Sequence, residues 1–406
     1  MRQPARAPAR PTKAVASEHL TGSTWQYLLL LWLAGNCLRL SMLAVPPLLT
    51  TIHHGLGLNE TAIGALTALP VLLMAVAAVP GSLLIARIGA RRALLVGFTL
   101  VALAGAARGL GQSAVVLFAM TFLMGLGVAV AQPALPSLVR LWFPRRIGLA
   151  TAVYSNGLLV GEIVAVSLTA PLILPLVGGW PWALAVWSIP VALTVVALAV
   201  LTAHVPRVQG VASARWWPNW RDPLTWRVGL ILGCAATMYF NANAFIPDYL
   251  KATHRPELIN PSLTSLNALQ LIASFLVLAF PGRLVGRREP FIVIGLLTLV
   301  AIAGFLTLPG FAAVIAVSFV GFCSAMGLIL NLALPPLIAA PDDVHRFSAA
   351  IFAISYSCAF VTSLVGGAVW DATGIPATAF TLVAVSGATM VILARGLSLP
   401  GLRKEE

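Results

Sequence analysis

The sequence consists of long apolar runs separated by short polar stretches. Each run is about 20 residues or longer, which is the length that a helix needs to cross roughly 30 Å of hydrocarbon. The runs lack the alternation of apolar and polar residues that is typical of strands in a membrane barrel. The pattern therefore predicts an all-α polytopic membrane protein with 12 transmembrane helices. The expected spans are 25–51, 60–86, 93–110, 114–140, 147–174, 180–202, 226–250, 262–282, 290–308, 311–339, 347–370 and 376–396.

Proline residues recur inside these runs in both parts of the chain. Proline has no backbone N–H and its ring disturbs the preceding helical turn, so we expect the helices to be interrupted at these positions. Broken helices are a feature of transporters that work by rocking motions, although proline is also common in membrane helices generally. The prolines concerned are Pro46, Pro47, Pro70, Pro133, Pro136, Pro247, Pro335 and Pro336.

Composition supports a membrane protein, because 59% of the residues are hydrophobic and only 9% are charged. A soluble domain carries roughly 25% charged residues, so this chain has too few polar groups to cover a globule in water. Lipid is the solvent that it suits. In lipid each unpaired backbone group costs several kcal/mol, which restricts the spanning structure to helices or a closed barrel.

The net charge of +13 is carried by short basic clusters between the apolar runs. Clusters of this kind are typical of cytoplasmic membrane loops and argue against nucleic-acid binding. All but four of the 25 Lys and Arg residues fall on one side of the expected membrane; the exceptions are Arg39, Arg108, Lys251 and Arg255. The positive-inside rule then places both termini in the cytoplasm. We expect a multi-pass protein of the bacterial inner membrane, surrounded by the lipid bilayer.

Short sequence matches recur in the same order at offsets of 199 to 202 residues. Six helices separate the two copies, so both copies have the same orientation, and such parallel repeats occur in major facilitator transporters. We expect two six-helix bundles related by pseudo-two-fold symmetry. The matches pair Pro80-Gly81 with Pro281-Gly282, Met124-Gly125-Leu126 with Met326-Gly327-Leu328, Ala134-Leu135-Pro136 with Ala333-Leu334-Pro335, and Tyr154-Ser155 with Tyr356-Ser357.

A long basic stretch near the middle of the chain marks the boundary between the copies. It contains three tryptophans and several arginines, which suit the lipid headgroup region. The expected organisation is a disordered cytoplasmic tail at 1–24, an N-terminal bundle at 25–202, a cytoplasmic linker at 203–225, a C-terminal bundle at 226–396 and a cytoplasmic tail at 397–406.

Arg39 lies near the middle of the first expected span. A charge at that depth costs at least about 2.5–3.5 kcal/mol unless it is solvated or paired. One interpretation is a cation in a water-filled cavity that binds an anionic or strongly polar substrate, because the guanidinium fork donates two parallel hydrogen bonds to a planar anion. The other is a structural arginine that pairs with an acid on a neighbouring helix. Glu162, in the fifth span, is the candidate partner, and it could instead carry protons or have a purely local role.

Other polar residues occur at membrane depth in both copies. Each is a candidate for lining a substrate path, and for each the simpler alternative is a hydrogen bond between helices, worth roughly 0.6 kcal/mol on average. Asn267 and Gln270, three positions apart in the eighth span, share a helix face and are weaker candidates. The substrate-binding candidates beside Arg39 are Asn36, Gln132, Tyr154, Tyr239, Asn243, Asn331 and Tyr356.

Motifs for catalysis or metal binding do not stand out. The four cysteines all lie inside apolar runs with no C-x-x-C spacing, so they read as small core residues. The chain has no HExxH, P-loop or nucleophile-elbow sequence. We therefore expect no catalytic residues, no metal and no cofactor, and a protein that is not an enzyme.

Several stretches resemble one family of the major facilitator superfamily, the cyanate/nitroimidazole (CynX/NimT-like) transporters. The resemblance covers nearly the whole chain and is densest in the first half. It rests on Asn36-x-x-Arg39, Pro47-Leu48-Leu49, the run Leu66 to Leu72, Arg87-Ile88-Gly89-Ala90-Arg91-Arg92, Gly125 to Gly127, Leu135-Pro136, Phe143-Pro144-x-Arg146-x-Gly148, Tyr154-Ser155, Ile246-Pro247-x-x-Leu250 and Tyr356.

The sequence departs from this family's pattern at Leu40, where proline is usual, and at Gln132, where asparagine is usual. Ala86 stands where the superfamily's short basic loop has an acid, so gating here can use other contacts. The resemblance implies a gating role for that loop and a small, flat, anionic or polar organic substrate. The gating residues that it implies are Arg87, Gly89, Arg91 and Arg92.

Taken together, these features predict a secondary active transporter. We expect it to move a small anionic or polar organic molecule by alternating access, with proton coupling through Glu162 as one option, and to work as a monomer. The alternative is an exporter of drugs or metabolites in which Arg39 and Glu162 form only a structural pair.

Overall fold

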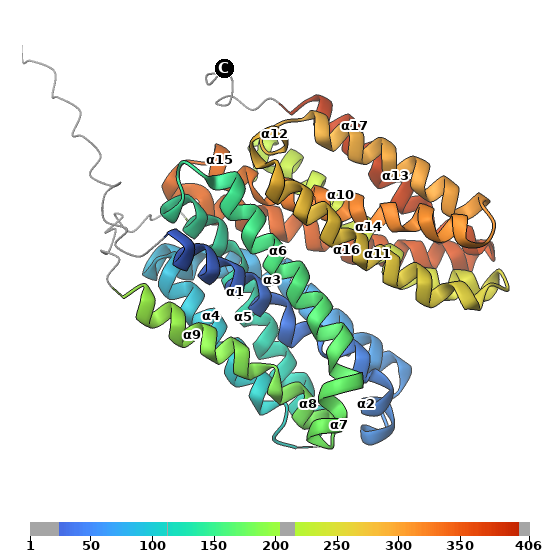
Figure 1. Cartoon of the computed structure of the whole chain (residues 1–406), viewed down its shortest axis with the longest axis horizontal. Helices are drawn as coiled ribbons and strands as arrows, with labels where there is room; N and C mark the ends of the chain where they lie inside the picture. The colour runs from blue at the N-terminus through green and yellow to red at the C-terminus, as the bar shows by residue number, and fades with distance from the viewer. Residues whose placement is uncertain (1–23, 112, 204–215, 398–406) are drawn as a thin grey trace, which may run out of the picture.

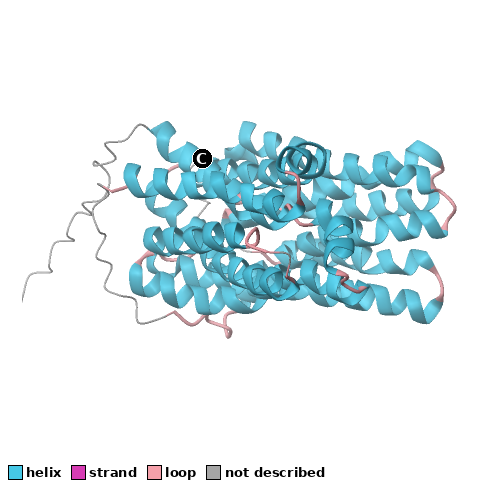
Figure 2. Cartoon of the chain, turned by 90° about the horizontal axis from the view of Figure 1, so that it is seen from below, coloured by secondary structure: helices cyan, strands magenta, loops and turns pink. Residues whose placement is uncertain are grey.

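The computed structural model describes residues 24–111, 113–203 and 216–397. Within these ranges the chain is helical and contains no strand (Figure 2). Twelve helical segments are long and apolar enough to cross a membrane, and they match the twelve expected spans to within about six residues at each end. The predicted tails and most of the linker (1–23, 204–215 and 398–406) lie outside the described residues.

The first part of the chain forms one bundle, here called the N-half. Its helices are coloured blue to green in Figure 1. They are α1 (Thr24–Leu43), α2 (Leu49–Leu56), α3 (Glu60–Ile88), α4 (Ala90–Ala107), α5 (Ala114–Trp142), α6 (Ile147–Leu168), α7 (Leu174–Val177), α8 (Trp180–Val186) and α9 (Ser188–Leu201).

The second part forms another bundle, the C-half, coloured yellow to red in Figure 1. Its helices are α10 (Pro223–Ala252), α11 (Ile259–Ala279), α12 (Pro281–Leu284), α13 (Glu289–Thr307), α14 (Gly310–Leu332), α15 (Leu334–Ile338), α16 (Val344–Thr373) and α17 (Thr381–Arg395).

The two halves pack their helices in the same way. In the N-half α1 packs against α6, α3 against α5, and α4 against α5 and α9. In the C-half the equivalent spans do the same: α10 packs against α16, α11 against α14, and α13 against α14 and α17. This correspondence agrees with the parallel repeat read from the sequence, and it gives two six-span bundles of one design.

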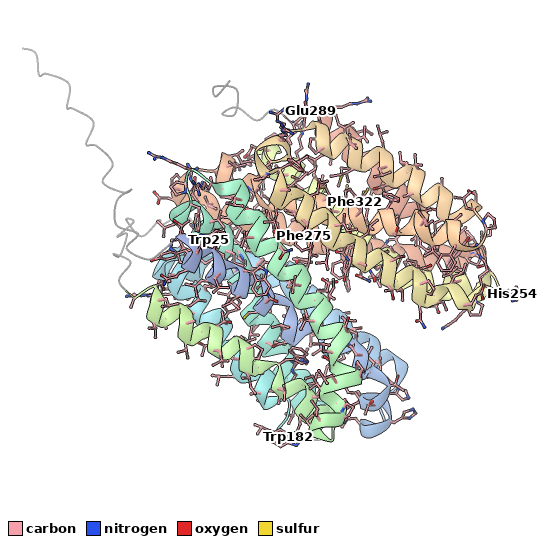
Figure 3. All side chains as sticks on the ribbon, in the orientation of Figure 1. Trp25, Trp182, His254, Phe275, Glu289 and Phe322 are labelled. Atoms are coloured by element: carbon pink, nitrogen blue, oxygen red, sulfur yellow. The ribbon has the colours of Figure 1, made fainter. Side chains whose placement is uncertain are left out.

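Contacts between the halves come from the helices that face each other. α3 packs against α16, and α6 packs against α11. The bundles lie together at the end that holds the starts of α1 and α10, here called the linker end, and diverge toward the opposite, far end (Figure 1). In Figure 3, Trp25 and Glu289 lie toward the linker end, whereas Trp182 and His254 lie at the far tips of separate bundles.

Prolines interrupt the helices at only some of the expected positions. The first span breaks at Ala44–Val45 before Pro46, and the tenth breaks at Ala333 before Pro335. By contrast, Pro70, Pro133, Pro136 and Pro247 lie inside continuous helices, so the expectation of an interruption was wrong there. Membrane helices tolerate interior proline because neighbouring helices and local adjustments satisfy the freed backbone groups.

Candidate functional site

A small cavity lies between the two halves. Six spans contribute to it, because α1 and α6 line it from the N-half and α10, α11, α14 and α16 line it from the C-half. Most of the lining is apolar, with a few polar groups that converge on it, as is usual for small-molecule sites. The polar lining residues are Arg39, Glu162, Tyr239, Gln270, Ser324, Ser355 and Tyr356.

Close packing of α1 on α6 brings Arg39 and Glu162 to the same wall of the cavity. The contact is made through glycines: a Cβ on Gly157 would collide with the backbone of Trp32, and one on Gly161 would lie 2.7 Å from the carbonyl oxygen of Asn36. Gly157 and Gly161 are four residues apart, which is the small-xxx-small spacing that lets membrane helices approach closely.

Arg39 is buried and faces the cavity. Its Nε atom has no hydrogen-bond partner. The guanidinium is close enough to Glu162, Tyr239 and Tyr356 to interact with them electrostatically. Even so, within the described residues no nitrogen of Arg39 lies within 4.0 Å of a Glu162 carboxylate oxygen. The two charges therefore face a shared space without forming a closed ion pair.

Glu162 is engaged from the other half of the molecule. The hydroxyl of Tyr239, on α10, donates a hydrogen bond to Oε1 of Glu162, on α6. This contact crosses the boundary between the N-half and the C-half. A carboxyl group held in this way connects the state of the site to the relative position of the two bundles.

Aromatic rings form much of the C-half wall. Phe352 and Tyr356 are one helical turn apart on α16, and their rings are nearly parallel, with centroids 6.2 Å apart. Phe240, on α10, meets Tyr356 edge-on at 6.5 Å and Tyr239 edge-on at 5.1 Å. Offset and edge-to-face arrangements of this kind offer flat surfaces on which a planar ligand can stack.

Two sets of hydrogen bonds join the halves on the linker side of the cavity. The side chain of Gln132 on α5 donates to the hydroxyl of Tyr356 at 2.8 Å. Asn156 on α6 accepts from the indole of Trp32 at 2.9 Å and donates to the hydroxyl of Ser274 on α11 at 3.1 Å. Because the two halves diverge toward the far end, these bonds close the cavity on the linker side.

The substrate-binding candidates from the sequence divide into two groups. Arg39, Tyr239 and Tyr356 line the cavity, and Glu162, which the sequence marks for proton coupling or ion pairing, lies on the same wall. Gln132 does not line the cavity, but its side chain donates a hydrogen bond to the hydroxyl of Tyr356, which does. The remaining candidates lie outside the lining: Asn36, Tyr154, Asn243 and Asn331.

These remaining candidates have mainly local contacts. Asn36 donates to the carbonyl of Trp32 in its own helix at 3.0 Å, and Asn331 donates to the carbonyl of Val228 at 2.9 Å. Tyr154 is fully buried, and its hydroxyl has no partner. Asn243 belongs to a chain of amides in which Gln270 donates to Asn267 at 2.8 Å and Asn267 donates to Asn243 at 3.1 Å.

The basic loop between α3 and α4 lies at the linker end. Gly89 joins the two helices with a φ of 85°, which favours glycine, and Arg87 and Arg92 are exposed. Arg91 reaches α9, where it donates to the hydroxyl of Thr202 at 2.5 Å and to the carbonyl of Ala199 at 3.0 Å. These bonds of Arg91 stay within the N-half.

The sequence did not single out Phe240, Phe352, Ser324 and Ser355, which also line the cavity. The aromatic residues could have been suspected, because Phe240 is adjacent to Tyr239 and Phe352 lies one turn before Tyr356. The serines gave no signal among many small residues. Within the described residues, no cluster of three His, Cys, Asp or Glu side chains could hold a metal ion.

A sequence model described as the Major Facilitator Superfamily matches residues 31–367 of this chain. The chain belongs to that superfamily. It is 24% identical over 351 residues to the uncharacterized transporter YycB of Bacillus subtilis, covering 85% of each protein. It is 26% identical over 282 residues to the cyanate transport protein CynX of Escherichia coli, covering 70% of this chain and 73% of CynX. It is 28% identical over 351 residues to the 2-nitroimidazole transporter of Escherichia coli, covering 83% and 86%.

Solved structures of the superfamily have the same fold. The chain matches the transporter FucP in its outward conformation with a TM-score of 0.71 and 17% identity, over 92% of this chain and 99% of FucP. It matches the human organic anion transporter MFSD10 with a TM-score of 0.68 and 13% identity, over 92% and 100%. The protein is thus a multi-pass secondary transporter of small molecules that resembles the CynX/NimT-like family, and it is homologous to bacterial transporters.

Proposed function

We propose that this transporter moves a small, flat anion or strongly polar organic molecule and binds it at Arg39. The observation that carries the proposal is a buried guanidinium that lines the cavity between the halves; its Nε has no partner, and among the described residues no carboxylate oxygen lies within 4.0 Å. A ligand with two coplanar oxygens can accept parallel hydrogen bonds from such a group. Burial without a partner is costly for an arginine at membrane depth, so a substrate that supplies the missing charge binds favourably.

The aromatic wall opposite Arg39 favours a planar ligand. Phe240, Phe352 and Tyr356 all line the cavity and pack against one another. The named relatives are consistent with this shape, because cyanate is a small anion and 2-nitroimidazole is a flat ring with a nitro group. A planar carboxylate or nitro compound combines both features and is the substrate class that we favour.

The proposed mechanism is alternating access between the two halves, with residues 25–202 and 226–396 as the moving units. Closure on the linker side by the Gln132–Tyr356 and Asn156–Ser274 bonds, together with divergence at the far end, supports an outward-facing state. The likeness to FucP in its outward conformation supports the same assignment. Opening to the other side would break these two bonds and form new contacts at the far end.

We place the protein in the bacterial inner membrane with both termini in the cytoplasm, because the basic residues concentrate at the linker end. The short basic loop of Arg87, Gly89, Arg91 and Arg92 then faces the cytoplasm, where we assign it a role in gating, and Arg91 fixes it to the end of α9. A single chain supplies both walls of the cavity, so a monomer suffices. The role is transport and not catalysis.

Glu162 is proposed as the coupling group. It lies on the same wall as Arg39 and is bonded across the halves by Tyr239. Protonation of the carboxylate would weaken this contact, because a neutral carboxyl is a poorer acceptor, and would change the net charge beside the bound anion. The alternative of a drug exporter with a structural Arg39–Glu162 pair is disfavoured by the separation of the two charges.

The test is ligand-dependent thermal stabilisation of purified protein in detergent. Benzoate, nitrate, cyanate and 2-nitroimidazole are compared on the native chain and on Arg39→Ala. Planar anions are expected to raise the melting temperature of the native chain and to leave the variant unchanged. If stabilisation survives in Arg39→Ala at the same ligand concentrations, the proposed site is wrong.

A matched pair of ligands tests the preference for flat molecules. Benzoate and cyclohexanecarboxylate carry the same charge, but only the first has a planar ring. Aromatic pairs add roughly 0.5–1.5 kcal/mol beyond burial, so benzoate is expected to bind about 2- to 10-fold more tightly. Phe352→Leu should reduce that difference. Equal affinities in the native chain would argue against the stacking wall.

A further inference from the structure

A second buried arginine lies outside the cavity, in the interior of the N-half. Arg108 follows the last residue of α4, at the end of the expected span 93–110, and is completely buried. Its Nη2 atom donates to the carbonyl oxygen of Ser41 in the last turn of α1 at 2.7 Å. The Nε and Nη1 atoms have no hydrogen-bond partner. One hydrogen bond is therefore made by a cation that carries five N–H donors.

Two hydroxyl groups beside Arg108 also lack partners. The side chains of Ser41 on α1 and Ser188 on α9 are both buried, and neither Oγ atom forms a hydrogen bond. Both border the same face of Gly105: a Cβ there would collide with Ser188 Oγ and lie 3.6 Å from Ser41 Oγ. Arg108 lies three residues after Gly105, so its side chain leaves the helix on that same face.

Among the described residues, no salt bridge joins Arg108 to an acidic side chain. Between residues 24 and 203 the sequence contains only two acids, Glu60 and Glu162. Glu60 begins α3, and Glu162 faces the central cavity and accepts its bond from Tyr239. The helices that supply the cluster and its neighbour Gly105, namely α1, α4 and α9, contain no Asp or Glu. Because an arginine stays protonated in proteins, the cluster has a net positive charge.

The carbonyl of Ser41 accounts for only part of this arrangement. It is one of the last four carbonyls of α1, which have no partner within the helix, and the C-terminal end of a helix attracts cations. This interaction explains the position of Nη2. It does not account for Nε, Nη1 or the two hydroxyls, which are all buried without a hydrogen-bond partner.

We propose that Arg108, Ser41 and Ser188 form a binding site for a small inorganic anion of the size of chloride. The guanidinium supplies the charge, and the two serine hydroxyls complete the donor set. The site is separate from the substrate cavity, since none of its three residues lines that cavity. Through Ser41 it holds the end of α1, two residues beyond Arg39, immediately before the break at Ala44–Val45.

Thermal unfolding of the purified full chain in sodium chloride, sodium bromide and sodium gluconate of equal ionic strength tests the site. Chloride and bromide are expected to raise the melting temperature in a saturable way relative to gluconate, which is too large for a buried site. Arg39→Gln should keep this halide effect, because the proposed anion does not bind in the substrate cavity. Equal melting temperatures in all three salts would overturn the proposal and leave water as the partner of these donors.

Variants at Ser188 make the test specific. Ser188→Asp places a carboxylate beside Arg108, so the protein should become insensitive to halide. Ser188→Asn, similar in size but neutral, should still respond to halide. The double variant Ser41→Ala/Ser188→Ala should raise the half-saturating chloride concentration about tenfold or more, because bonds to a charged group are lost. A halide effect that persists unchanged in Ser188→Asp, or that vanishes in Arg39→Gln, contradicts the assignment.

Discussion

At the scale of single residues, the central feature is a pair of opposite charges that share a cavity without touching. Arg39 has an unpartnered Nε, and Glu162 is engaged by Tyr239 from the opposite half. A closed ion pair would satisfy both groups and leave little reason for a ligand to enter. The open arrangement leaves the guanidinium available and ties the carboxylate to the conformation of the transporter.

The affinity of Arg39 variants for a planar carboxylate should depend on the geometry of the side chain as well as on its charge. Arg39→Lys keeps the cation but loses the planar fork, and Arg39→Gln loses the charge. Losing one partner of a buried charge interaction costs roughly 2–5 kcal/mol, so we expect Arg39→Gln to weaken binding of a planar carboxylate about 30-fold or more, with Arg39→Lys in between. Isothermal titration of benzoate measures the order. A lysine variant that binds as well as the native chain would contradict bidentate recognition.

Glu162→Gln tests coupling. The amide keeps the size of the side chain but cannot take up a proton at the pH of the assay. In proteoliposomes we expect it to lose accumulation driven by a pH gradient while it retains exchange of substrate at equal pH. Tyr239→Phe is the control, because it removes the hydrogen bond and leaves the carboxyl in place, so gradient-driven accumulation should persist at a reduced rate. Full accumulation by Glu162→Gln would remove the proton role.

The sequence identified the charged residues of the site better than it identified which polar side chains face the cavity. Arg39 and Glu162 were recognisable because charges at membrane depth are rare and costly. Asn36 and Asn331 were equally visible, yet both bond to backbone carbonyls away from the cavity. In lipid the outer face of a helix is as apolar as the bundle core, so the sequence carries little information on which way each helix is rotated.

At the scale of helices, the contact between α1 and α6 decides where the charges lie. Gly157 and Gly161 bring the two backbones together, and this close approach places Arg39 and Glu162 on one wall. The spans themselves could be predicted from the length of the apolar runs. The Gly157-x-x-x-Gly161 spacing was present in the sequence, but glycine is so frequent in this chain that the spacing alone does not identify a partner helix.

Gly161→Ala should destabilise the protein. Its Cβ would lie 2.7 Å and 2.8 Å from backbone atoms of Asn36, which cannot move without displacing α1. Overpacking of this kind costs about 1–3 kcal/mol, so the melting temperature in detergent should fall. Gly64→Ala is the matched control, because a Cβ there meets nothing within 4 Å on an exposed helix face. It should be neutral or slightly stabilising, and an equal loss in both variants would contradict the packing argument.

At the scale of the whole molecule, the closed linker end and the divergent far end define one of the two conformations that alternating access requires. The repeat, the span count and the division into halves were within reach of the sequence. The conformational state could not be predicted from the sequence, because the same amphipathic and charge patterns must be compatible with both states. Its signature is geometric and lies in inter-half bonds such as Gln132–Tyr356.

A disulfide across the linker end should trap this state. A Cβ on Gly148 would lie 3.3 Å from the Cβ of Val285 in the other half, near the separation of roughly 3.5–4.5 Å found in disulfides. Oxidised Gly148→Cys/Val285→Cys is expected to lose transport and to recover it on reduction, while substrate binding remains. Each single cysteine variant is the control. Full transport by the oxidised double variant would show that the linker end does not open.

The open charge pair also has an electrical consequence. Arg39 and Glu162 sum to zero, so the empty site carries no net charge as the halves move across the membrane field, whereas a site loaded with a monovalent anion carries one negative charge. Moving one charge through 100 mV involves roughly 2.3 kcal/mol. A proton on Glu162 would cancel that charge. Membrane voltage would therefore oppose anion entry in the absence of a proton and have little effect on the proton-loaded form.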